Sequence, residues 1–305
     1  MATSTSGRGH DGRAGITVAV TGAAGFIGAA VCRRLAEDGD EPIGVDLAGT
    51  DRTADVADPG STVAALAGAD AVIHAAAIVS EKGRMADFVR VNTRGTRNVL
   101  DAAAGRRVVV LASVAGWGYE FRRPLAEDAP PRPCGIPYID TKGATETLAL
   151  RRGATVIRPG DVYGAGSQPW VVRPLEMMRA GRFFLPAPGD GLITPVYVDD
   201  LVDGVVRALR EPSAAGRAYT VWDGEAVTAR EFFGHHARSL GQDRVRVLPA
   251  PLLRLAARAA GAGPAAVTFM QRRAVFPNTR AREELGWAPR VSLAEGMTRT
   301  LGDRT

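Results

Sequence analysis

The sequence predicts an α/β fold: a Rossmann-type doubly wound parallel sheet with a smaller, interwoven C-terminal lobe. Three observations support this prediction. Short β-branched and apolar runs alternate with helical patterns as far as Pro159, which is typical of parallel strands joined by crossover helices. A glycine-rich turn directly follows the first apolar run. Beyond Gly164, proline, glycine, tryptophan and phenylalanine become frequent, as expected where a second lobe begins.

The first predicted strand covers residues 16–21, and the first helix covers residues 29–37 with its apolar side chains on one face. The turn between them has the spacing G-x-x-G-x-x-G. Gly22 permits a sharp turn, Gly25 lets a pyrophosphate approach the backbone, and Gly28 lets the helix pack closely on the sheet. Because the helix N-terminus would face the anion, this stretch predicts a dinucleotide-phosphate site. A turn without a ligand is the alternative, since glycine is abundant in this chain.

A second predicted strand, residues 42–45, ends in Asp46, which lies 46 − 22 = 24 residues after Gly22. This is close to the spacing at which an acid binds the adenine ribose diol of a dinucleotide. A turn or helix cap is the alternative role. Such an acid would repel a 2′-phosphate, so we expect NAD as the cofactor and NADP as the alternative. Arg52 lies close in sequence and would partly offset that repulsion.

Three more strands are predicted at residues 71–74, 107–112 and 155–158. The alanines that follow the first of these would let a cofactor lie close to the backbone. His74 is expected to be a structural histidine beneath the cofactor, with a catalytic acid as the alternative. The remaining predicted elements are helices at 62–67, 85–104, 137–150, 200–209, 228–240 and 251–260, a loop at 47–53, short strands at 196–198 and 218–222, and helix caps at Asp199, Thr228 and Ser292.

These patterns divide the chain into three parts. We expect a disordered tail over residues 1–15, a Rossmann domain over residues 16–164, and mainly a substrate-binding lobe over residues 165–305. The sequence shows no linker between the two lobes. Segments near residues 193–222 are therefore expected to return to the Rossmann core.

Composition excludes several classes of protein. The chain of 305 residues is 46% hydrophobic, yet no apolar run approaches the roughly 18 residues of a membrane span. The net charge is +5, but arginines are interleaved with acids and accompany no nucleic-acid recognition motif. Cys32 and Cys134 provide neither a disulfide framework nor a metal cluster. We expect a cytoplasmic protein with a small-molecule substrate and without nucleic-acid, membrane or metal partners; a homodimer is left open.

A tyrosine and a lysine carry the expected chemistry. Tyr138 and Lys142 are four residues apart on a predicted helix and so share one face. A phenol has an unperturbed pKa of about 10. An ammonium about 4 Å away, at an effective dielectric of about 20, would stabilise the phenolate by roughly 4 kcal/mol, or up to about three pKa units. Ser113, at the end of a predicted strand, could hydrogen-bond the same substrate oxygen. We expect these three residues to be catalytic; a chance surface pair is the alternative.

With these residues the chain resembles the extended short-chain dehydrogenase/reductase family, also called the NAD-dependent epimerase/dehydratase family. The resemblance runs from about Ile16 to Leu301. It implies a Rossmann fold and a nicotinamide cofactor, with Tyr138 as acid/base, Lys142 as a ribose ligand that lowers the tyrosine pKa, and Ser113 orienting the substrate oxygen. Besides the glycine turn, Asp46 and the three catalytic residues, the matching pieces are Asp55-Val56, His74 to Ala77, Asn92 in Val-Asn-Thr-Arg-Gly-Thr, Trp117-Gly118, Arg158 to Gly164, Val196 to Asp200 and Leu285 to Pro289.

The resemblance and the glycine turn together define the expected cofactor contacts. Asp55 and Val56 would meet the adenine. The full expected set is Gly22, Gly25, Phe26, Ile27, Asp46, Leu47, Asp55, Val56, Ala75, Ala76, Ala77, Tyr138, Lys142, Pro159, Gly160 and Val162.

Two departures from the family pattern bear on the substrate. Asp161 stands where sugar-nucleotide members commonly have asparagine, and residues 191–198 lack the arginine that commonly holds a diphosphate. Trp117, Trp170, Phe183 and Phe184 could line an apolar pocket, with the core of the lobe as the alternative. The segments around His74 and Lys142 look like the hydroxysteroid-dehydrogenase and flavonoid-reductase branch. The candidate substrate contacts are Val79, Val114, Trp117, Asp161 and Trp170.

The leading hypothesis is an NAD(P)-dependent alcohol dehydrogenase or ketoreductase acting on a lipophilic small molecule, such as a steroid or polyketide. A nucleotide-sugar epimerase or reductase is the alternative enzyme. A non-catalytic NAD(P)-binding regulator is the alternative from another class, and the intact serine, tyrosine and lysine set argues against it.

Overall fold

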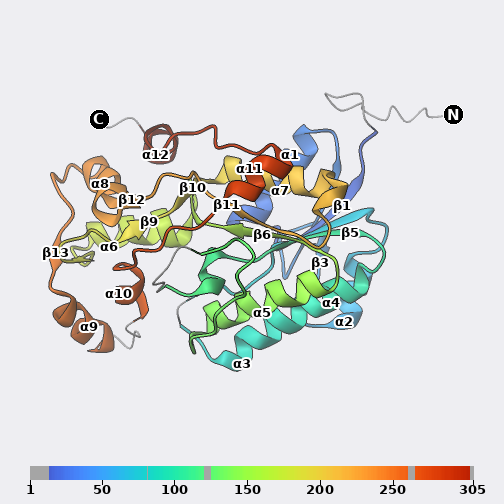
Figure 1. Cartoon of the computed structure of the whole chain (residues 1–305), viewed down its shortest axis with the longest axis horizontal. Coiled ribbons are helices and arrows are strands. Elements are labelled where there is room, and N and C mark those ends of the chain that lie inside the picture. Colours follow the sequence, from blue (N-terminus) through green and yellow to red (C-terminus); the bar gives the residue numbers. More distant parts are fainter. Residues whose placement is uncertain (1–13, 81, 120–124, 260–264, 303–305) are drawn as a thin grey trace.

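The structure, a computed structural model, describes residues 14–80, 82–119, 125–259 and 265–302. Its centre is a seven-stranded sheet in the order β11-β6-β5-β4-β1-β2-β3, in which the neighbouring strands run parallel (Figure 1). The chain builds outward from β1 in one direction and then from β4 in the other, so the order reverses between these two strands. The strands are β1 (Thr17–Thr21), β2 (Glu41–Asp46), β3 (Arg52–Thr53), β4 (Ala71–His74), β5 (Arg107–Leu111), β6 (Thr155–Pro159) and β11 (Ala218–Val221).

Helices cover both faces of this sheet (Figure 1). One face carries α1 (Phe26–Glu37) and α7 (Val198–Arg210), which pack against each other and are joined by an ion pair between Arg34 and Asp203 at 3.1 Å. The other face carries α2 (Pro59–Ala65), α3 (Met85–Phe88), the π-helical segment η1 (Val89–Arg94), α4 (Gly95–Ala102) and α5 (Pro137–Arg151). The predicted fold class is confirmed.

The smaller lobe is assembled from three two-stranded sheets and several helices. β7 pairs with β10, β9 with β12, and β8 with β13. The strands are β7 (Asp161–Tyr163), β8 (Leu185–Pro186), β9 (Leu192–Ile193), β10 (Pro195–Tyr197), β12 (Val227–Thr228) and β13 (Val247–Leu248). The helices of this lobe are η3 (Gln168–Val172), α6 (Arg173–Arg179), α8 (Ala229–Ser239), α9 (Ala250–Ala259), α10 (Ala265–Phe269) and α12 (Leu293–Leu301). Beside the large sheet, α11 (Thr279–Leu285) packs against β11 and α7, and two short turns of 3-10 helix, η2 (Val114–Trp117) and η4 (Pro212–Ala214), pack against α5 and α7.

The two largest parts of the core follow the two faces of the sheet. One extends from β1 and α1 through α7 into the smaller lobe, where Phe232 and Phe233 are fully buried. The other lies between the sheet and α2, α4 and α5. The core of the smaller lobe is therefore continuous with one face of the sheet. None of the helices in the described ranges is both long and apolar enough to cross a membrane.

Several elements differ from the sequence predictions. The first helix begins at Phe26, three residues earlier than expected, because Gly25 already serves as its N-cap. β3 forms inside the predicted loop at 47–53 and extends the sheet beside β2. Asp199 lies inside the first turn of α7 and does not cap it, since Tyr197 is the N-cap. The tail predicted at residues 1–15 falls almost wholly on residues 1–13, which lie outside the described residues.

Candidate active site

The glycine turn lies at the carboxyl edge of the sheet, between β1 and α1. Gly22 has a φ of +76°, and a Cβ there would approach the backbone nitrogen of Ala76 to 2.6 Å. A Cβ on Gly28 would overlap the carbonyl oxygen of Gly22. Both positions therefore require glycine, one for backbone conformation and close approach to the next strand, the other for helix packing.

The N-terminus of α1 suits an anion. Gly25 is the N-cap and brings no capping side chain, so the backbone N–H groups of the first turn are left to an external acceptor. A hollow of about 610 Å³ lies beside this turn, and its lining includes Gly25, Phe26, Gly166 and Tyr197. These features fit the pyrophosphate of a dinucleotide.

Asp46 lies at the end of β2, beside the glycine turn. Its carboxylate accepts hydrogen bonds from the backbone N–H of Ala24 at 3.0 Å and of Leu47 at 2.7 Å, and the Leu47 side chain is exposed. The Arg52 guanidinium is engaged elsewhere, because it donates to the carbonyl oxygens of Ala65 and Ala67 at 2.9 and 2.7 Å. It therefore does not offset the charge of the Asp46 carboxylate as expected.

The pair expected at the adenine is held by other contacts. Asp55 accepts from the guanidinium of Arg90 at 2.8 Å and from the backbone N–H of Ala57 at 2.9 Å, and the Arg90 bond is the main cause of the lowered pKa of Asp55. The Val56 side chain is buried against Gly95. Arg90 is a candidate for the adenine end of the site that sequence spacing did not indicate.

His74 ties the end of β4 to its surroundings. Its Nδ1 lies 2.7 Å from the Thr21 hydroxyl and its Nε2 lies 3.0 Å from the Thr96 hydroxyl. Burial, with a smaller contribution from the Lys142 charge, lowers the pKa of His74 to about 3. The ring is therefore neutral and enclosed, with both nitrogens engaged.

The π-helical segment η1 places Asn92 between two parts of the site. The Asn92 side chain accepts from the backbone N–H of Ile78 at 2.7 Å and donates to the Thr141 hydroxyl at 3.1 Å. The main-chain carbonyl oxygen of Asn92 accepts from the hydroxyls of Thr96 and Thr145. Asn92 thus links the segment after β4 to α5, which carries Tyr138 and Lys142.

Ser113 and Tyr138 meet at the edge of the sheet. Ser113 follows β5 and caps η2, where its Oγ accepts from the backbone N–H of Ala115 at 3.1 Å. The η2 turn that Ser113 caps packs against α5, and the Ser113 side chain acts to lower the pKa of Tyr138. Burial has the larger effect, and the Asp161 carboxylate adds to it, so the pKa of Tyr138 lies above its ordinary value.

Lys142 is directed at the sheet in this structure. It is buried, and its Nζ donates to the carbonyl oxygen of Leu111 at 2.7 Å. Burial lowers the pKa of Lys142 to about 8. The expected lowering of the Tyr138 pKa by this lysine is therefore wrong for the protein without ligand: the shift of Tyr138 has the opposite direction, because loss of solvent outweighs the favourable contacts.

The segment after β6 crosses from the sheet into the smaller lobe. Gly160 donates its N–H to the carbonyl oxygen of Val221 at 3.0 Å, and a Cβ there would meet Trp222 at 2.8 Å. Pro159 ends β6, and the Val162 side chain belongs to the core. The alanines after β4, Ala75 to Ala77, are partly exposed at the same edge of the sheet.

The residues expected at the substrate lie in different surroundings. Val79 is 56% exposed near the end of β4, whereas Val114 and Trp117 are buried. Trp117 stacks on Phe276 with ring centroids 5.8 Å apart and has the Arg158 guanidinium 4.4 Å from its ring. Those contacts make Trp117 part of a small core cluster beside the site.

The aromatic residues of the lobe pack on one another. Trp170 contacts Phe232, Phe233 and Phe269, and its carbonyl oxygen lies 2.8 Å from Nε2 of His236. Phe183 packs against Phe233, and Phe184 lies beneath the Arg246 guanidinium. Trp170 and Phe183 are thus buried in the core of the lobe, which was the alternative to their lining an apolar substrate pocket.

Asp161 is buried and paired with an arginine distant in sequence. Its Oδ2 accepts from the backbone N–H of Thr194 at 2.7 Å and forms an ion pair with Arg272, which is also buried. Sequence reasoning singled out Asp161 and missed Arg272. Within the described ranges, no group of three or more His, Cys, Asp or Glu side chains is placed to hold a metal ion.

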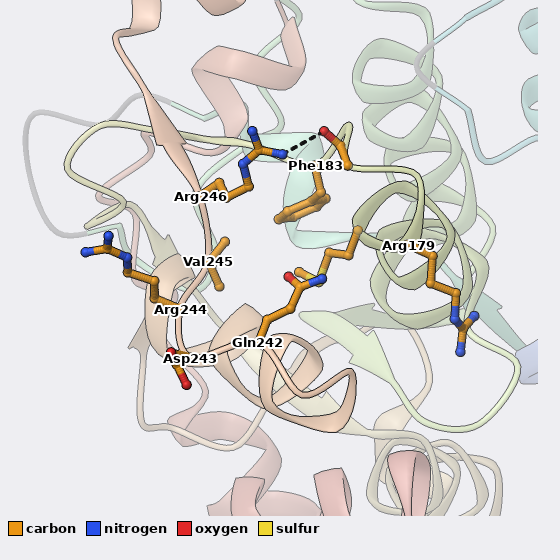
Figure 2. Close-up of a pocket in the computed structure, with 9 residues that line it drawn as sticks. Arg179, Phe183, Gln242, Asp243, Arg244, Val245 and Arg246 are labelled. Carbon is orange, nitrogen blue, oxygen red and sulfur yellow. Dashed lines mark hydrogen bonds between the residues drawn. The ribbon is translucent and has the colours of Figure 1, made fainter.

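A second hollow, of about 460 Å³, lies within the smaller lobe beside α6. In Figure 2, Arg179 and Arg244 point away from each other on opposite sides of it. Arg246 bends back, where it donates to the carbonyl oxygen of Gly181 at 3.0 Å. The arginines therefore do not converge on a common ligand position.

The fold and this edge of the sheet define a class: a dinucleotide-binding α/β protein with a serine and a tyrosine at the edge of the sheet that carries the cofactor turn. The chain matches the model of the NAD dependent epimerase/dehydratase family over residues 18–221, and it belongs to that family. The family is of the extended short-chain dehydrogenase/reductase type, and its dependence on NAD confirms the expected cofactor.

Similar proteins differ in the reactions for which they are named. The chain is 33% identical to a UDP-glucose 4-epimerase of Mycolicibacterium smegmatis, covering 92% of this chain and 96% of the relative. It is 28% identical to a 2-alkyl-3-oxoalkanoate reductase of Stenotrophomonas maltophilia, over 92% and 97%. Its fold is similar to that of MoeE5 in complex with UDP-glucose and NAD, with a TM-score of 0.78, 25% identity and coverage of 93% and 97%.

Proposed function

We propose that this protein is an NAD-dependent alcohol dehydrogenase or ketoreductase that acts on a lipophilic small molecule, such as a steroid, a polyketide or another natural product. The observation that carries the proposal is the placement of Ser113 and Tyr138 at the carboxyl edge of the sheet, where η2, which Ser113 caps, packs against α5, which carries Tyr138. Lys142 lies one helical turn beyond Tyr138 on α5, on the same helix face.

NAD, when bound, accepts a hydride from an alcohol carbon, and NADH returns one to a carbonyl carbon. The protein's part is to position the substrate oxygen and to move its proton. Tyr138 has a raised pKa, so its phenol is protonated at neutral pH and can donate that proton to a carbonyl oxygen. Ser113 is placed to donate a second hydrogen bond to the same oxygen.

The residues of the glycine turn fit the cofactor. The uncapped N-terminus of α1 would receive the pyrophosphate, and Asp46 would accept from the ribose hydroxyls. Arg52 is engaged at the end of α2, and this supports NAD over NADP because no guanidinium from that residue offsets the Asp46 charge. Lys142 would bind the nicotinamide ribose once it exchanges its bond to Leu111.

Three observations support a substrate that carries no phosphate or diphosphate. Residues 192–194, where an arginine would be expected for a diphosphate, place a buried isoleucine and threonine beside Asp161. The 2-alkyl-3-oxoalkanoate reductase among the relatives is named for an alkyl-substituted oxo acid, which carries a carboxylate but no phosphate. The resemblance to the hydroxysteroid-dehydrogenase branch points in the same direction.

The second candidate is a nucleotide-sugar epimerase or reductase, and it is favoured by the 33% identity to a UDP-glucose 4-epimerase. A non-catalytic NAD-binding regulator is a weaker candidate, because such a protein has no need for Ser113, Tyr138 and Lys142 together.

The two enzyme hypotheses are separated by paired measurements on the purified protein. We expect consumption of NADH with hydrophobic ketones, or formation of NADH with the corresponding alcohols, followed by the absorbance of the reduced nicotinamide. We expect no rise in melting temperature with UDP or dTDP in the presence of NAD. A melting shift with UDP or dTDP, at concentrations where inorganic phosphate has no effect, would favour the epimerase instead.

A further inference from the structure

A buried ion pair adjoins the proposed reaction centre. Asp161 and Arg272 are each 4% exposed, and they come from different parts of the chain: Asp161 begins β7 and Arg272 follows α10. β5 and β6 are adjacent parallel strands, and Ser113 follows the carboxyl end of β5 as Asp161 follows that of β6. The pair therefore borders the site where the substrate oxygen is expected.

Arg272 is held by its partner and by its surroundings. Its Nε donates to the carbonyl oxygen of Leu192 at 3.0 Å, and its guanidinium lies 4.1 Å from the ring of Phe269. Asp161 is held by the backbone N–H of Thr194 at 2.7 Å and by the Thr194 hydroxyl at 3.1 Å. Segment 192–194 thus carries no arginine of its own, yet the guanidinium of Arg272 lies against it.

The charge of that guanidinium is already balanced. A substrate bearing a phosphate could use Arg272 only by displacing Asp161, which would leave a buried carboxylate without its counter-ion beside the substrate's own negative charge. Breaking a buried pair in this way is strongly unfavourable. An uncharged carbonyl compound makes no such demand.

We propose that the Asp161–Arg272 pair determines the charge of the substrate: by holding Arg272, Asp161 excludes compounds that carry a phosphate or diphosphate and leaves the site to uncharged carbonyl compounds. This inference rests on the proposed function in that it takes Tyr138 as the centre of the reaction. It concerns binding, however, and it can be tested without turnover.

The test uses the full-length protein saturated with NAD, with inorganic pyrophosphate and UDP as probes in calorimetric titrations. The wild type is expected to bind neither. Asp161→Asn keeps the shape of the side chain and frees Arg272, so it is expected to bind pyrophosphate at least tenfold more tightly than the wild type. Asp161→Asn/Arg272→Met and Arg272→Met are the matched controls, and both are expected to bind as weakly as the wild type.

A second measurement follows ionisation of the tyrosine directly. The ultraviolet absorbance of tyrosinate is titrated in each protein and in its Tyr138→Phe version, and the difference isolates Tyr138. We expect Asp161→Asn to lower the apparent pKa of Tyr138, because a negative charge has been removed from its surroundings. The double variant Asp161→Asn/Arg272→Met buries neither charge, and we expect it also to lower the apparent pKa of Tyr138. It provides this measurement should Asp161→Asn fail to fold.

Two results would overturn the proposal. One is pyrophosphate or UDP binding by the wild type that is lost in Arg272→Met, since Arg272 would then be available to anions. The other is an Asp161→Asn protein that folds, binds pyrophosphate no better than the wild type and leaves the Tyr138 titration unchanged, as a purely structural pair would. A negative ketone assay alone would count against the proposed function and would leave these binding results standing.

Discussion

At the scale of single residues, the proposed function depends most on the phenol of Tyr138, which is assigned the transfer of a proton to or from the substrate oxygen. Tyr138→Phe removes only the oxygen that would transfer the proton, and the ring remains on α5. We expect turnover to fall by roughly 10²- to 10⁴-fold, the usual contribution of a positioned acid or base, with NADH affinity unchanged. Steady-state rates and NADH fluorescence titrations measure the two effects separately.

The control for that variant is Tyr219→Phe. Tyr219 lies on β11, where its hydroxyl donates to Glu284 at 3.0 Å. We expect removal of this hydroxyl to leave turnover unchanged. Near-normal turnover in Tyr138→Phe would remove the acid/base assignment and require the proton to come from elsewhere.

The sequence predicted the positions of the candidate site residues in the fold better than their electrostatics. Ser113, Tyr138 and Lys142 could be placed because a strand end and an i, i+4 spacing on a helix are local patterns. The direction in which the pKa of Tyr138 shifts could not be predicted from the sequence. It depends on how much solvent the fold removes from the phenol and on the nearby charge of Asp161. The partner of Asp161 is 272 − 161 = 111 residues away, beyond any local pattern.

At the scale of elements, the turn after β2 determines the cofactor preference. Asp46→Asn weakens the acceptor for the ribose hydroxyls and removes the charge that would repel a 2′-phosphate. We expect NADH to bind more weakly by about tenfold or more, since a hydrogen bond to a charged group contributes roughly 1.5–3 kcal/mol, and the preference over NADPH to shrink. Dissociation constants for both cofactors measure this.

Asp70→Asn is a suitable comparison for Asp46→Asn. The Asp70 carboxylate accepts from the backbone N–H of Thr17 at 2.8 Å, at the opposite end of β1, so cofactor preference should not change. Tighter binding of NADPH than of NADH by the wild type would show that Asp46 does not contact the ribose.

The elements that the sequence predicted are the long ones with a clear period. The strands of the sheet from β1 to β6 were found except for β3, whose two residues are too few to form a pattern. The helix predicted at 85–104 was found, but its central π-helical turn η1 was not, because one widened turn leaves the apolar spacing almost unchanged. Asn92 lies in that turn, and its side chain contacts Ile78 and Thr141 from there.

At the scale of the whole molecule, buried titratable groups predict how stability varies with pH. Burial raises the pKa of Asp223 to about 8, and its Oδ1 has no hydrogen-bond partner. The native state therefore keeps a proton that the unfolded state loses near pH 4, and stability falls as the pH rises from there to about 8. Asp223→Asn should remove that loss.

We expect the melting temperature of Asp223→Asn to exceed that of the wild type by an amount that grows between pH 6 and pH 8 and then levels off. Two pH units correspond to at most about 3 kcal/mol. On the acid side, the buried histidines His74 and His236, with pKa values lowered to about 3 and about 4, should make both proteins lose stability as the pH falls below about 6.5. A difference in melting temperature that is the same at pH 6 and pH 8 would contradict the assignment to Asp223.

The pairing of β11 with β6 governs the order in which the protein can be completed during synthesis. Until Val221 has left the ribosome, β6 has an open hydrogen-bonding edge, and before Arg210 emerges α7 does not yet cover its face of the sheet. The residues of α6 and β8 are made in this interval, before the sheet is finished. An open edge on a buried apolar strand is prone to pair with other chains. A nascent chain of this protein therefore has its greatest need of chaperone protection while residues from about 160 to 221 are being synthesised. At that stage the cofactor turn, β5 and α5 have already been made, but the sheet still lacks its last strand.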